Sequence, residues 1–230
     1  MAETVTFPSN GNSASGYLAT PDGDSGPGVI VVQEWWGLGP GIKEMADRLA
    51  SAGFVALVPD LFHGELAGHD EVDKAAAMMQ ALPMDRVARD MSGAVDFLVG
   101  DPRVTGPAIG AIGFCMGGGL AMTLGATRPD VVKAVVTFYG IPSNDADIDW
   151  AGMTAVVRGH MGGADDFYGP EAVRAVEKKL QDLGKDVQFT VHPGAGHAFM
   201  GPHNAFGTLD EELSAKIWPG VTTFLHEQLD

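Results

Sequence analysis

Apolar residues along the chain follow two patterns that alternate: short unbroken runs, and stripes in which apolar positions are three and four residues apart. Val29 to Val32 is an unbroken β-branched run, as expected for a strand that is buried on both faces. Residues 42–50 then carry apolar side chains at helical spacing, and Gly53 ends this stretch. Strand and helix patterns in alternation are typical of a mostly parallel sheet with helices on both sides.

The same alternation continues to the C-terminus. We expect further buried strands at residues 54–58, 108–114, 131–138, 154–157 and 187–191. We expect helices at residues 87–98, 120–126 and 173–183. Another helix would have the apolar face Val72, Ala76 and Met79 and would end before Pro83. The C-terminal stretch would form a final helix that is bent near Pro219. The prediction is therefore an α/β fold with about seven or eight strands, formed by a single domain of residues 1–230.

The opening segment has a different pattern. Thr4 to Phe7 and Ala14 to Ala19 have the alternation of two short strands, and the residues between them include Ser9-Asn10-Gly11-Asn12. Asn-Gly is a strong turn signal between strands. The sequence therefore predicts a hairpin at one edge of the sheet.

Composition and charge narrow the classes of function. Hydrophobic residues make up 45% and charged residues 19% of the 230 residues, which is typical of a folded protein and not of a disordered one. The 30 acidic and 14 basic residues give a net charge of −16, which opposes binding to nucleic acid and to anionic membrane surfaces. The sequence shows no leader pattern, no apolar run of roughly 20 residues and no second cysteine for a disulfide, so we expect a cytoplasmic protein.

The strongest signal for chemistry is the segment Gly113-Phe114-Cys115-Met116-Gly117, between an apolar strand and a glycine-rich helix start. It has the form glycine-x-nucleophile-x-glycine, an elbow that turns sharply from strand to helix and strains the backbone of the nucleophile. The positive end of a helix lowers the pKa of a thiol at this position, and the thiolate is the nucleophile. The amide of Met116 would point to where an oxyanion forms.

Other roles for this cysteine fit less well. A cysteine-dependent phosphatase needs an arginine six residues after the nucleophile, and that position is Ala121. A zinc site needs several cysteines or histidines at short spacing, and Cys115 is the one cysteine in the chain, so we expect no metal. A small buried side chain without chemistry is the remaining alternative.

A nucleophilic cysteine needs a base and a carboxylate that orients the base. In α/β hydrolases with this elbow, the chain order is nucleophile, acid, base. Downstream of Cys115, Asp165 and Asp166 follow one predicted strand and His197 follows another. The carboxyl ends of parallel strands meet at one edge of a sheet, which is where such sites form. The other histidines of the loops, His63, His69, His192 and His203, have no metal-ligand spacing, whereas His160 directly after a strand is a candidate for lining a pocket.

These residues resemble the dienelactone hydrolase family of α/β hydrolases over nearly the whole chain. The resemblance rests on Gln33-Glu34-Trp35-Trp36-Gly37, Val58-Pro59-Asp60-Leu61, the cysteine elbow through Gly118, Tyr139-Gly140, Gly159-His160-Met161-Gly162-Gly163-Ala164-Asp165 and Gly196-His197-Ala198-Phe199. The cysteine elbow together with Gln-Glu after the first buried strand is specific, because most relatives carry serine at the elbow.

The resemblance implies a role for each site residue. Cys115 would be the nucleophile, His197 the general base, and Asp165 the carboxylate that orients it. Glu34 would contact the resting thiol and help the thiolate to form once substrate is bound. The backbone amides of Met116 and Trp35 would form the oxyanion hole.

The chain also departs from the family pattern. Two arginines hold the substrate carboxylate in dienelactone hydrolases, and at those positions this chain has Val72, Asp73 and Lys74 in one helix and Gly201 in the loop after His197. The pocket would instead be apolar, with candidate lining residues Trp36, Tyr139, Met79 and Phe199. A neutral ester or lactone is therefore the expected substrate.

The expected activity is hydrolysis of a small ester or lactone through a thioester on Cys115, with no metal or organic cofactor. The same triad could attack a phosphorus ester. A nucleotide-binding oxidoreductase is a weaker alternative, based on Gly37-Leu38-Gly39-Pro40-Gly41 and Asp60, and a non-catalytic binding module is another. We expect a small-molecule substrate as partner, no nucleic acid or membrane, and a monomer or small homo-oligomer.

Overall fold

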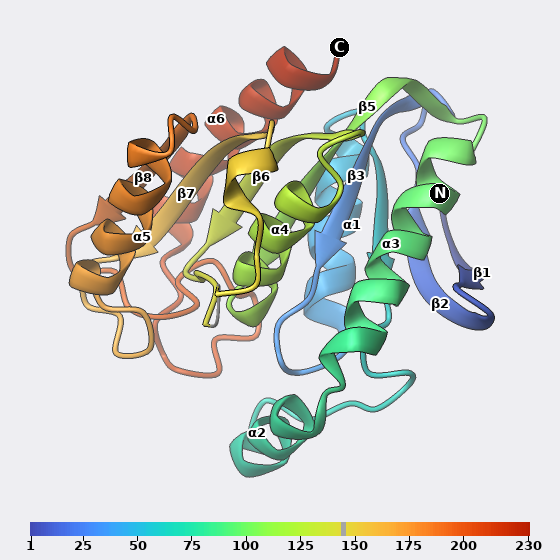
Figure 1. Cartoon of the computed structure of the whole chain (residues 1–230). Coiled ribbons are helices and arrows are strands. Elements are labelled where there is room, and N and C mark those ends of the chain that lie inside the picture. Colours follow the sequence, from blue (N-terminus) through green and yellow to red (C-terminus); the bar gives the residue numbers. More distant parts are fainter. Residues whose placement is uncertain (144–145) are drawn as a thin grey trace.

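An eight-stranded sheet forms the centre of the structure, in a computed structural model that describes residues 1–143 and 146–230 (Figure 1). The strand order is β1-β2-β4-β3-β5-β6-β7-β8. The pairs β1–β2 and β2–β4 are antiparallel, and the pairs from β4–β3 to β7–β8 are parallel. This confirms the predicted α/β hydrolase-like architecture with its mostly parallel sheet.

The strands and helices follow the predicted alternation. The strands are β1 Ala2–Ser9, β2 Asn12–Ala19, β3 Gly26–Val32, β4 Val55–Pro59, β5 Val104–Phe114, β6 Val132–Phe138, β7 Val156–Gly162 and β8 Val187–His192. The helices are α1 Pro40–Ser51, α2 Val72–Ala81, α3 Met84–Gly100, α4 Met116–Thr127, α5 Pro170–Asp182 and α6 Glu211–Leu229, with a short 3-10 turn at Trp150–Gly152. Strand β7 continues beyond the apolar run that predicted it.

Helices cover the sheet on both faces, which explains the unbroken apolar runs. Helices α1 and α6 lie on one face, and α3, α4 and α5 lie on the other (Figure 1). Along β3, Val29 and Val31 pack with the first group, while Ile30 and Val32 pack with the second. Each strand residue is thus buried whichever way it points, so alternation of polar and apolar residues is absent.

The predicted edge hairpin is present. Strand β1 is the outermost strand, and its last residue, Ser9, pairs with Asn12 of β2. The two turn residues Asn10 and Gly11 have φ values of 42° and 90°. A two-residue turn with positive φ at both positions matches the twist of a hairpin, which is why Asn-Gly is favoured there.

The apolar face predicted for α2 is wrong by one residue. Val72 and Met79 are 41% and 37% exposed, whereas Ala75 and Met78 are buried. Helix α2 lies beyond the end of the sheet (Figure 1) and does not cover it, so little of its surface meets the core. When a helix packs on so few neighbours, the spacing of its apolar residues does not determine which face is buried.

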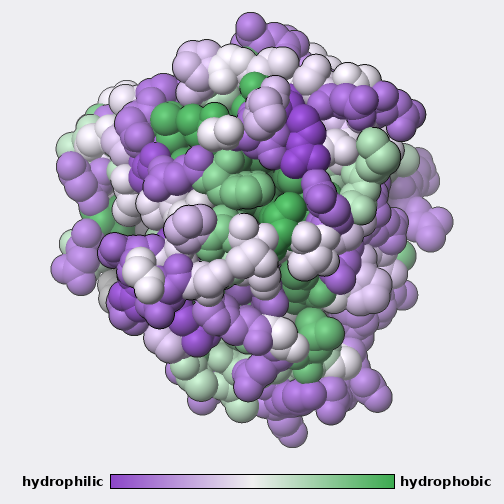
Figure 2. Space-filling view, turned by 90° about the vertical axis from the view of Figure 1, so that its right-hand side faces the viewer, coloured by the Kyte–Doolittle hydropathy of each residue, from purple (hydrophilic) through white to green (hydrophobic). Residues whose placement is uncertain are grey.

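On the face shown in Figure 2, hydrophobic residues are gathered in small areas that hydrophilic residues surround. Within the described residues, no helix is long and apolar enough to cross a bilayer.

One glycine sets the distance between α3 and the edge hairpin. A Cβ on Gly93 would lie 2.2 Å from the carbonyl oxygen of Pro8 in β1, whereas a Cβ on Gly100 in the same helix would meet nothing within 4 Å. We expect Gly93→Ala to lower the free energy of unfolding by about 1–3 kcal/mol, as overpacking does, and Gly100→Ala to leave it unchanged or raise it. Urea unfolding of both variants measures this. Equal midpoints for the two would contradict the packing described for α3.

Candidate active site

Cys115 is the turn between β5 and α4. Its φ is 55°, a left-handed conformation that strains a residue with a side chain. The turn is possible because its flanking residues are glycines: a Cβ on Gly113 would lie 1.9 Å from the carbonyl oxygen of Gly117, and one on Gly117 would lie 2.3 Å from that of Val32. The backbone thus presents the sulfur at the N-terminus of α4, at the carboxyl edge of the sheet.

Three residues from three separate loops meet at this edge. The Sγ atom of Cys115 lies 3.1 Å from Nε2 of His197, and Nδ1 of His197 lies 2.9 Å from Oδ2 of Asp165. All three residues are buried. Of the two aspartates that the chain order offered, Asp165 makes this contact, while Asp166 is exposed.

Asp165 is held in place by more than the imidazole. Its Oδ1 atom accepts hydrogen bonds from the backbone amides of Phe167 and Tyr168, at 2.7 and 2.9 Å. Burial alone would raise the pKa of Asp165, but the hydrogen bond and charge of His197 together with the two amides outweigh it, and the net pKa is lowered. An ionised Asp165 can only accept, so Nδ1 of His197 carries the hydrogen and Nε2 is free to take a proton from the thiol.

The environment of Cys115 favours the neutral thiol. Burial raises the pKa of Cys115, and the negative charges of Glu34 and Asp165 raise it further. A hydrogen bond from the amide of Met116 acts in the opposite direction but does not compensate. The side chain is therefore a thiol at neutral pH in the absence of substrate, with a base beside it.

Glu34 is the second residue after β3, and its carboxylate pairs with a histidine. Its Oε2 atom lies 2.7 Å from Nε2 of His203, which is as close as a direct charge-assisted hydrogen bond. The charge of Glu34 also acts on Tyr139, whose pKa is raised well above its ordinary value by burial and then by that charge. The sequence predicted a contact of Glu34 with the resting thiol; in the structure its charge acts on the thiol while its Oε2 is bonded to His203.

His203 is the site residue that sequence reasoning missed. Its side chain is 3% exposed, and its ring stacks on His69 with centroids 4.4 Å apart. The ring of Trp36 meets both histidines at 5.2 and 5.9 Å. A Cβ on Gly201 would lie 2.6 Å from Nε2 of His203, so the glycine at this position makes room for the imidazole. No spacing signals the pairing of Glu34 with His203, because the two residues are 169 positions apart.

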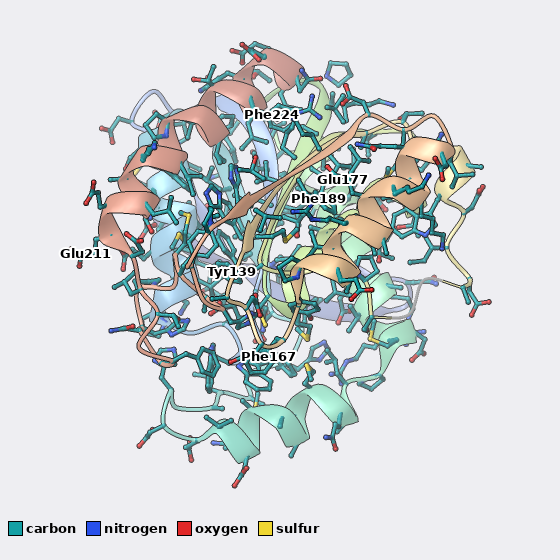
Figure 3. The ribbon with its side chains drawn as sticks, turned by 90° about the vertical axis from the view of Figure 1, so that its left-hand side faces the viewer. Tyr139, Phe167, Glu177, Phe189, Glu211 and Phe224 are labelled. Carbon is teal, nitrogen blue, oxygen red and sulfur yellow. The ribbon has the colours of Figure 1, made fainter. Side chains whose placement is uncertain are left out.

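The four predicted pocket residues lie in different places. Tyr139 and Phe199 are 1% and 0% exposed and pack behind His197, with the Tyr139 ring 5.3 Å from each of the other two rings. Figure 3 shows Tyr139 inside the molecule, whereas Phe167 lies at the edge that faces α2. Trp36 belongs to the cluster around His203. Met79 lines a cavity between α3 and α4.

This cavity has a volume of about 600 Å³ and lies beside the elbow. Met116, the residue after Cys115, and Tyr168, whose ring is 5.8 Å from that of His197, both line it. Its size is that of small-molecule sites in proteins.

Other histidines make contacts away from Cys115, His197 and Asp165. His160 lies within β7 and not after it, as the sequence had suggested, and its Nδ1 is 3.1 Å from Nε2 of His192, the last residue of β8. Burial and then the charge of His192 lower the pKa of His160 to about 4. His63 bonds to the buried Asp90, 2.7 Å away. Among residues 1–143 and 146–230, no group of three or more histidine, cysteine or acidic side chains is arranged so that it could hold a metal ion.

Comparisons with known proteins agree with one another. The family model described as the dienelactone hydrolase family matches residues 14–229. "Protein usf" of Aquifex pyrophilus is 38% identical over 205 residues, covering 87% of each chain, and the "Putative carboxymethylenebutenolidase" of Aquifex aeolicus is 35% identical over 234 residues, covering 100% of each.

Solved structures show the same fold. The dienelactone hydrolase-like promiscuous phosphotriesterase P91 from metagenomic libraries superposes with a TM-score of 0.85 at 26% identity, over 100% of this chain and 99% of that one. The dienelactone hydrolase of Anabaena variabilis superposes with a TM-score of 0.71 at 22% identity, over 100% and 99%.

The charge of Glu34 gives a measurable effect on the thiol. Because this charge raises the pKa of Cys115, Glu34→Gln should lower that pKa and increase the rate of alkylation by iodoacetamide at a fixed pH. The thiolate population rises about ten-fold for each unit by which the pKa falls, the lower nucleophilicity of the thiolate offsets about half of that gain on a logarithmic scale, and the midpoint of the rate–pH profile moves to lower pH. Glu44→Gln, at an exposed position of α1, serves as the control and should leave the profile unchanged. An unshifted midpoint in Glu34→Gln would show that the carboxylate does not act on the thiol.

Proposed function

This chain belongs to the dienelactone hydrolase family, a family of hydrolases acting on ester and lactone bonds, and we propose that it hydrolyses a small ester or lactone. In this proposal Cys115 is the nucleophile, His197 is the general base, and Asp165 orients His197. The observation that carries the proposal is the unbroken contact from Sγ through the imidazole to the carboxylate, at 3.1 and 2.9 Å. Those are hydrogen-bond distances at which a proton can move from the thiol to Nε2.

The reaction proceeds through a thioester. Nε2 of His197 takes the thiol proton as Sγ of Cys115 attacks the carbonyl carbon, and the carbonyl oxygen becomes an oxyanion. Collapse of this intermediate breaks the ester bond, and His197 gives its proton to the leaving alkoxide. A water molecule, deprotonated by Nε2, then attacks the thioester, and Cys115 is released as the thiol together with the carboxylic acid.

The oxyanion would be held by the backbone amides of Met116 and Trp35. Met116 is the first residue of α4, where the helix dipole also stabilises negative charge. The start of α4 packs directly on the end of β3, since a Cβ on Gly117 would lie 2.3 and 2.5 Å from the carbonyl oxygens of Val32 and Gln33. This contact supports the proposal because it brings the segment containing Trp35 to the elbow.

Glu34 and His203 extend the site. We propose that Glu34 promotes formation of the thiolate once substrate is bound, and that His203 holds its carboxylate in position. In the resting state burial, and after it the charge of Glu34, raises the pKa of Cys115 and favours the protonated thiol. A protonated thiol resists oxidation and alkylation, so the nucleophile is generated mainly when substrate is present.

Hydrolysis of a phosphorus ester on the same triad is the second candidate. The observation that favours it is the fold similarity to P91, described as a promiscuous phosphotriesterase. The nucleotide-binding alternative finds no support, since a Cβ on Gly37 would lie 2.4 Å from the carbonyl oxygen of Glu65. That glycine faces the protein's own backbone and leaves no room for a pyrophosphate. We further propose that the enzyme acts in the cytoplasm as a monomer or small homo-oligomer, without a metal or organic cofactor.

The first test is hydrolysis of 4-nitrophenyl acetate by the wild type and by Cys115→Ala. We expect the variant to lose at least about a thousand-fold in kcat/KM, as removal of a nucleophile does. Matched circular dichroism spectra control for folding. Paraoxon, assayed in parallel, tests the phosphorus-ester candidate. Equal, slow rates in both proteins would contradict the triad and favour a binding module.

The orienting carboxylate has a matched control next to it in the chain. Asp165→Asn keeps the shape of the side chain but presents an amide to Nδ1, so we expect kcat to fall by roughly a hundred- to ten-thousand-fold. Asp166→Asn changes the exposed neighbour and should leave kcat unchanged. If the two variants lost activity to the same extent, Asp165 would not be the residue that orients His197.

A further inference from the structure

The cavity between α3 and α4 bears on the choice of substrate. Resting on the function proposed above, we propose that the substrate is an ester with an apolar, unbranched acyl chain of about eight to ten carbon atoms, and that this chain lies in the cavity. Four observations support the proposal: the apolar lining of the cavity, the direction in which the cavity runs from Cys115, the position of His197 outside the cavity, and the ion pairs that Arg128 makes at its far end.

The lining is mainly apolar. Helices α3 and α4 lie side by side on one face of the sheet (Figure 1), and the cavity of about 600 Å³ lies between them. The apolar lining includes Leu82, Met91, Leu120, Leu124, Ile141 and Ile148. An apolar group that leaves water for such a cavity gains binding free energy in proportion to its area. Met79 and Met84, which are partly exposed, border it with unbranched side chains that adapt to different ligands.

The cavity runs from the elbow along α4. Met116, Gly119, Thr123 and Thr127 line it on successive turns of the helix. The distance along the axis from Met116 to Thr123 is about 10 Å at 1.5 Å per residue, and α4 as a whole spans about 18 Å. Because the bonds of an extended chain zigzag, each C–C bond of about 1.5 Å advances it by only about 1.25 Å, so a chain of eight to ten carbons reaches roughly 9 to 11 Å. A chain that starts at a carbonyl on Cys115 would thus end near the level of Thr123, inside the cavity.

The position of His197 assigns this space to the acyl chain. The leaving group must lie at Nε2 of His197, which gives it a proton. The imidazole is surrounded by Tyr139, Phe167 and Phe206, whereas the cavity is lined by α2, α3, α4, the segment after β6 and Tyr168. Tyr168 touches both regions and marks the boundary between them. With the alcohol toward His197, the acyl carbons point between α3 and α4.

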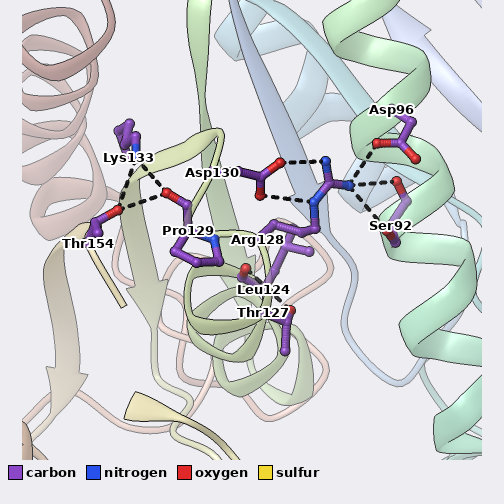
Figure 4. A network of polar contacts seen from close by, with 9 residues as sticks. All are labelled: Ser92, Asp96, Leu124, Thr127, Arg128, Pro129, Asp130, Lys133 and Thr154. Atoms are coloured by element: carbon purple, nitrogen blue, oxygen red, sulfur yellow. Dashed lines mark hydrogen bonds and ion pairs between the residues drawn. The ribbon is translucent and has the colours of Figure 1, made fainter. Parts of the chain in front are cut away.

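The far end of the cavity does not offer a free charge. Arg128 lines it there, but its guanidinium is bonded to Asp96 at 2.8 Å and to Asp130 at 3.1 Å, and it also donates to Ser92 (Figure 4). The side-chain hydrogen bond of Asp130 is the largest cause that raises the pKa of Arg128. A guanidinium with two carboxylates is neutralised, so a second carboxylate on the substrate gains little there. The chain is therefore expected to end in a methyl group.

Two isomeric esters test whether the cavity binds the acyl chain or the alcohol chain of the substrate. Ethyl octanoate and octyl acetate have the same atoms, but the long chain is on the acyl side in the first and on the alcohol side in the second. We expect kcat/KM of the wild type to be at least about ten-fold higher for ethyl octanoate, since each buried methylene contributes roughly three- to four-fold. Equal values, or a preference for octyl acetate, would overturn the assignment.

A variant that fills the cavity tests its location. Thr123→Trp places a large ring about 10 Å from the elbow, and we expect it to lower the ratio of kcat/KM for 4-nitrophenyl octanoate over 4-nitrophenyl acetate by at least about ten-fold. Thr223→Trp makes the same change at an exposed position of α6 and should leave the ratio as in the wild type. An unchanged ratio in Thr123→Trp would place the chain elsewhere and overturn the inference.

A binding experiment separates this inference from the proposed function. In Cys115→Ala, which cannot form a thioester, octanamide should bind in a calorimetric titration at least about ten-fold more tightly than acetamide, and the added Thr123→Trp change should remove the difference. If esters are hydrolysed without preference for chain length and octanamide does not bind, the cavity inference is overturned and the proposed function stands. If octanamide binds in this way but no ester is hydrolysed, the cavity inference stands and the proposed function fails.

Discussion

The left-handed turn at Cys115 is the constraint on which the rest of the site depends. At this point β5 ends and α4 begins within a single residue, and the approach is so close that added side chains at Gly113 and Gly117 would overlap backbone oxygens. This contact presses α4 against the end of β3, which places the segment after β3, with Glu34 and Trp35, beside the sulfur. The direction of α4 from the turn also sets the direction of the cavity, so strain in one residue positions the proposed nucleophile, the proposed oxyanion donor and the proposed acyl space together.

Opposing electrostatic effects determine the protonation of the site residues. Burial and two neighbouring carboxylates oppose a thiolate at Cys115, while the amide of Met116 favours it. Asp165 bears a negative charge because His197 and two backbone amides stabilise it. The carboxylate of Glu34 is hydrogen-bonded to the imidazole of His203, which packs against the rings of Trp36 and His69. These effects favour a neutral thiol at Cys115 beside an ionised Asp165, and in the proposed mechanism the thiol loses its proton only when a substrate carbonyl accepts the electrons of the sulfur.

The sequence allowed most of the fold to be predicted, since both faces of the sheet are buried and the runs and stripes are unbroken. It also allowed Cys115, His197 and Asp165 to be selected, because each follows a strand and the strands share one edge. It did not reveal His203, since no local pattern links a loop histidine to a carboxylate 169 positions away. Nor did it separate Tyr139 and Phe199, which pack behind the imidazole, from Met79, which lines the cavity, because an apolar residue near a motif serves either purpose.

Gly201 and His203 bear on how such a site can change over generations. The imidazole of His203 occupies the space that any side chain at position 201 would need. A side chain at 201 therefore requires the imidazole at 203 to shift, and such a shift disturbs its hydrogen bond to Glu34. Changes at position 201 are thus coupled to the Glu34–His203 pair, and the free energies of substitutions at positions 201 and 203 are not expected to add.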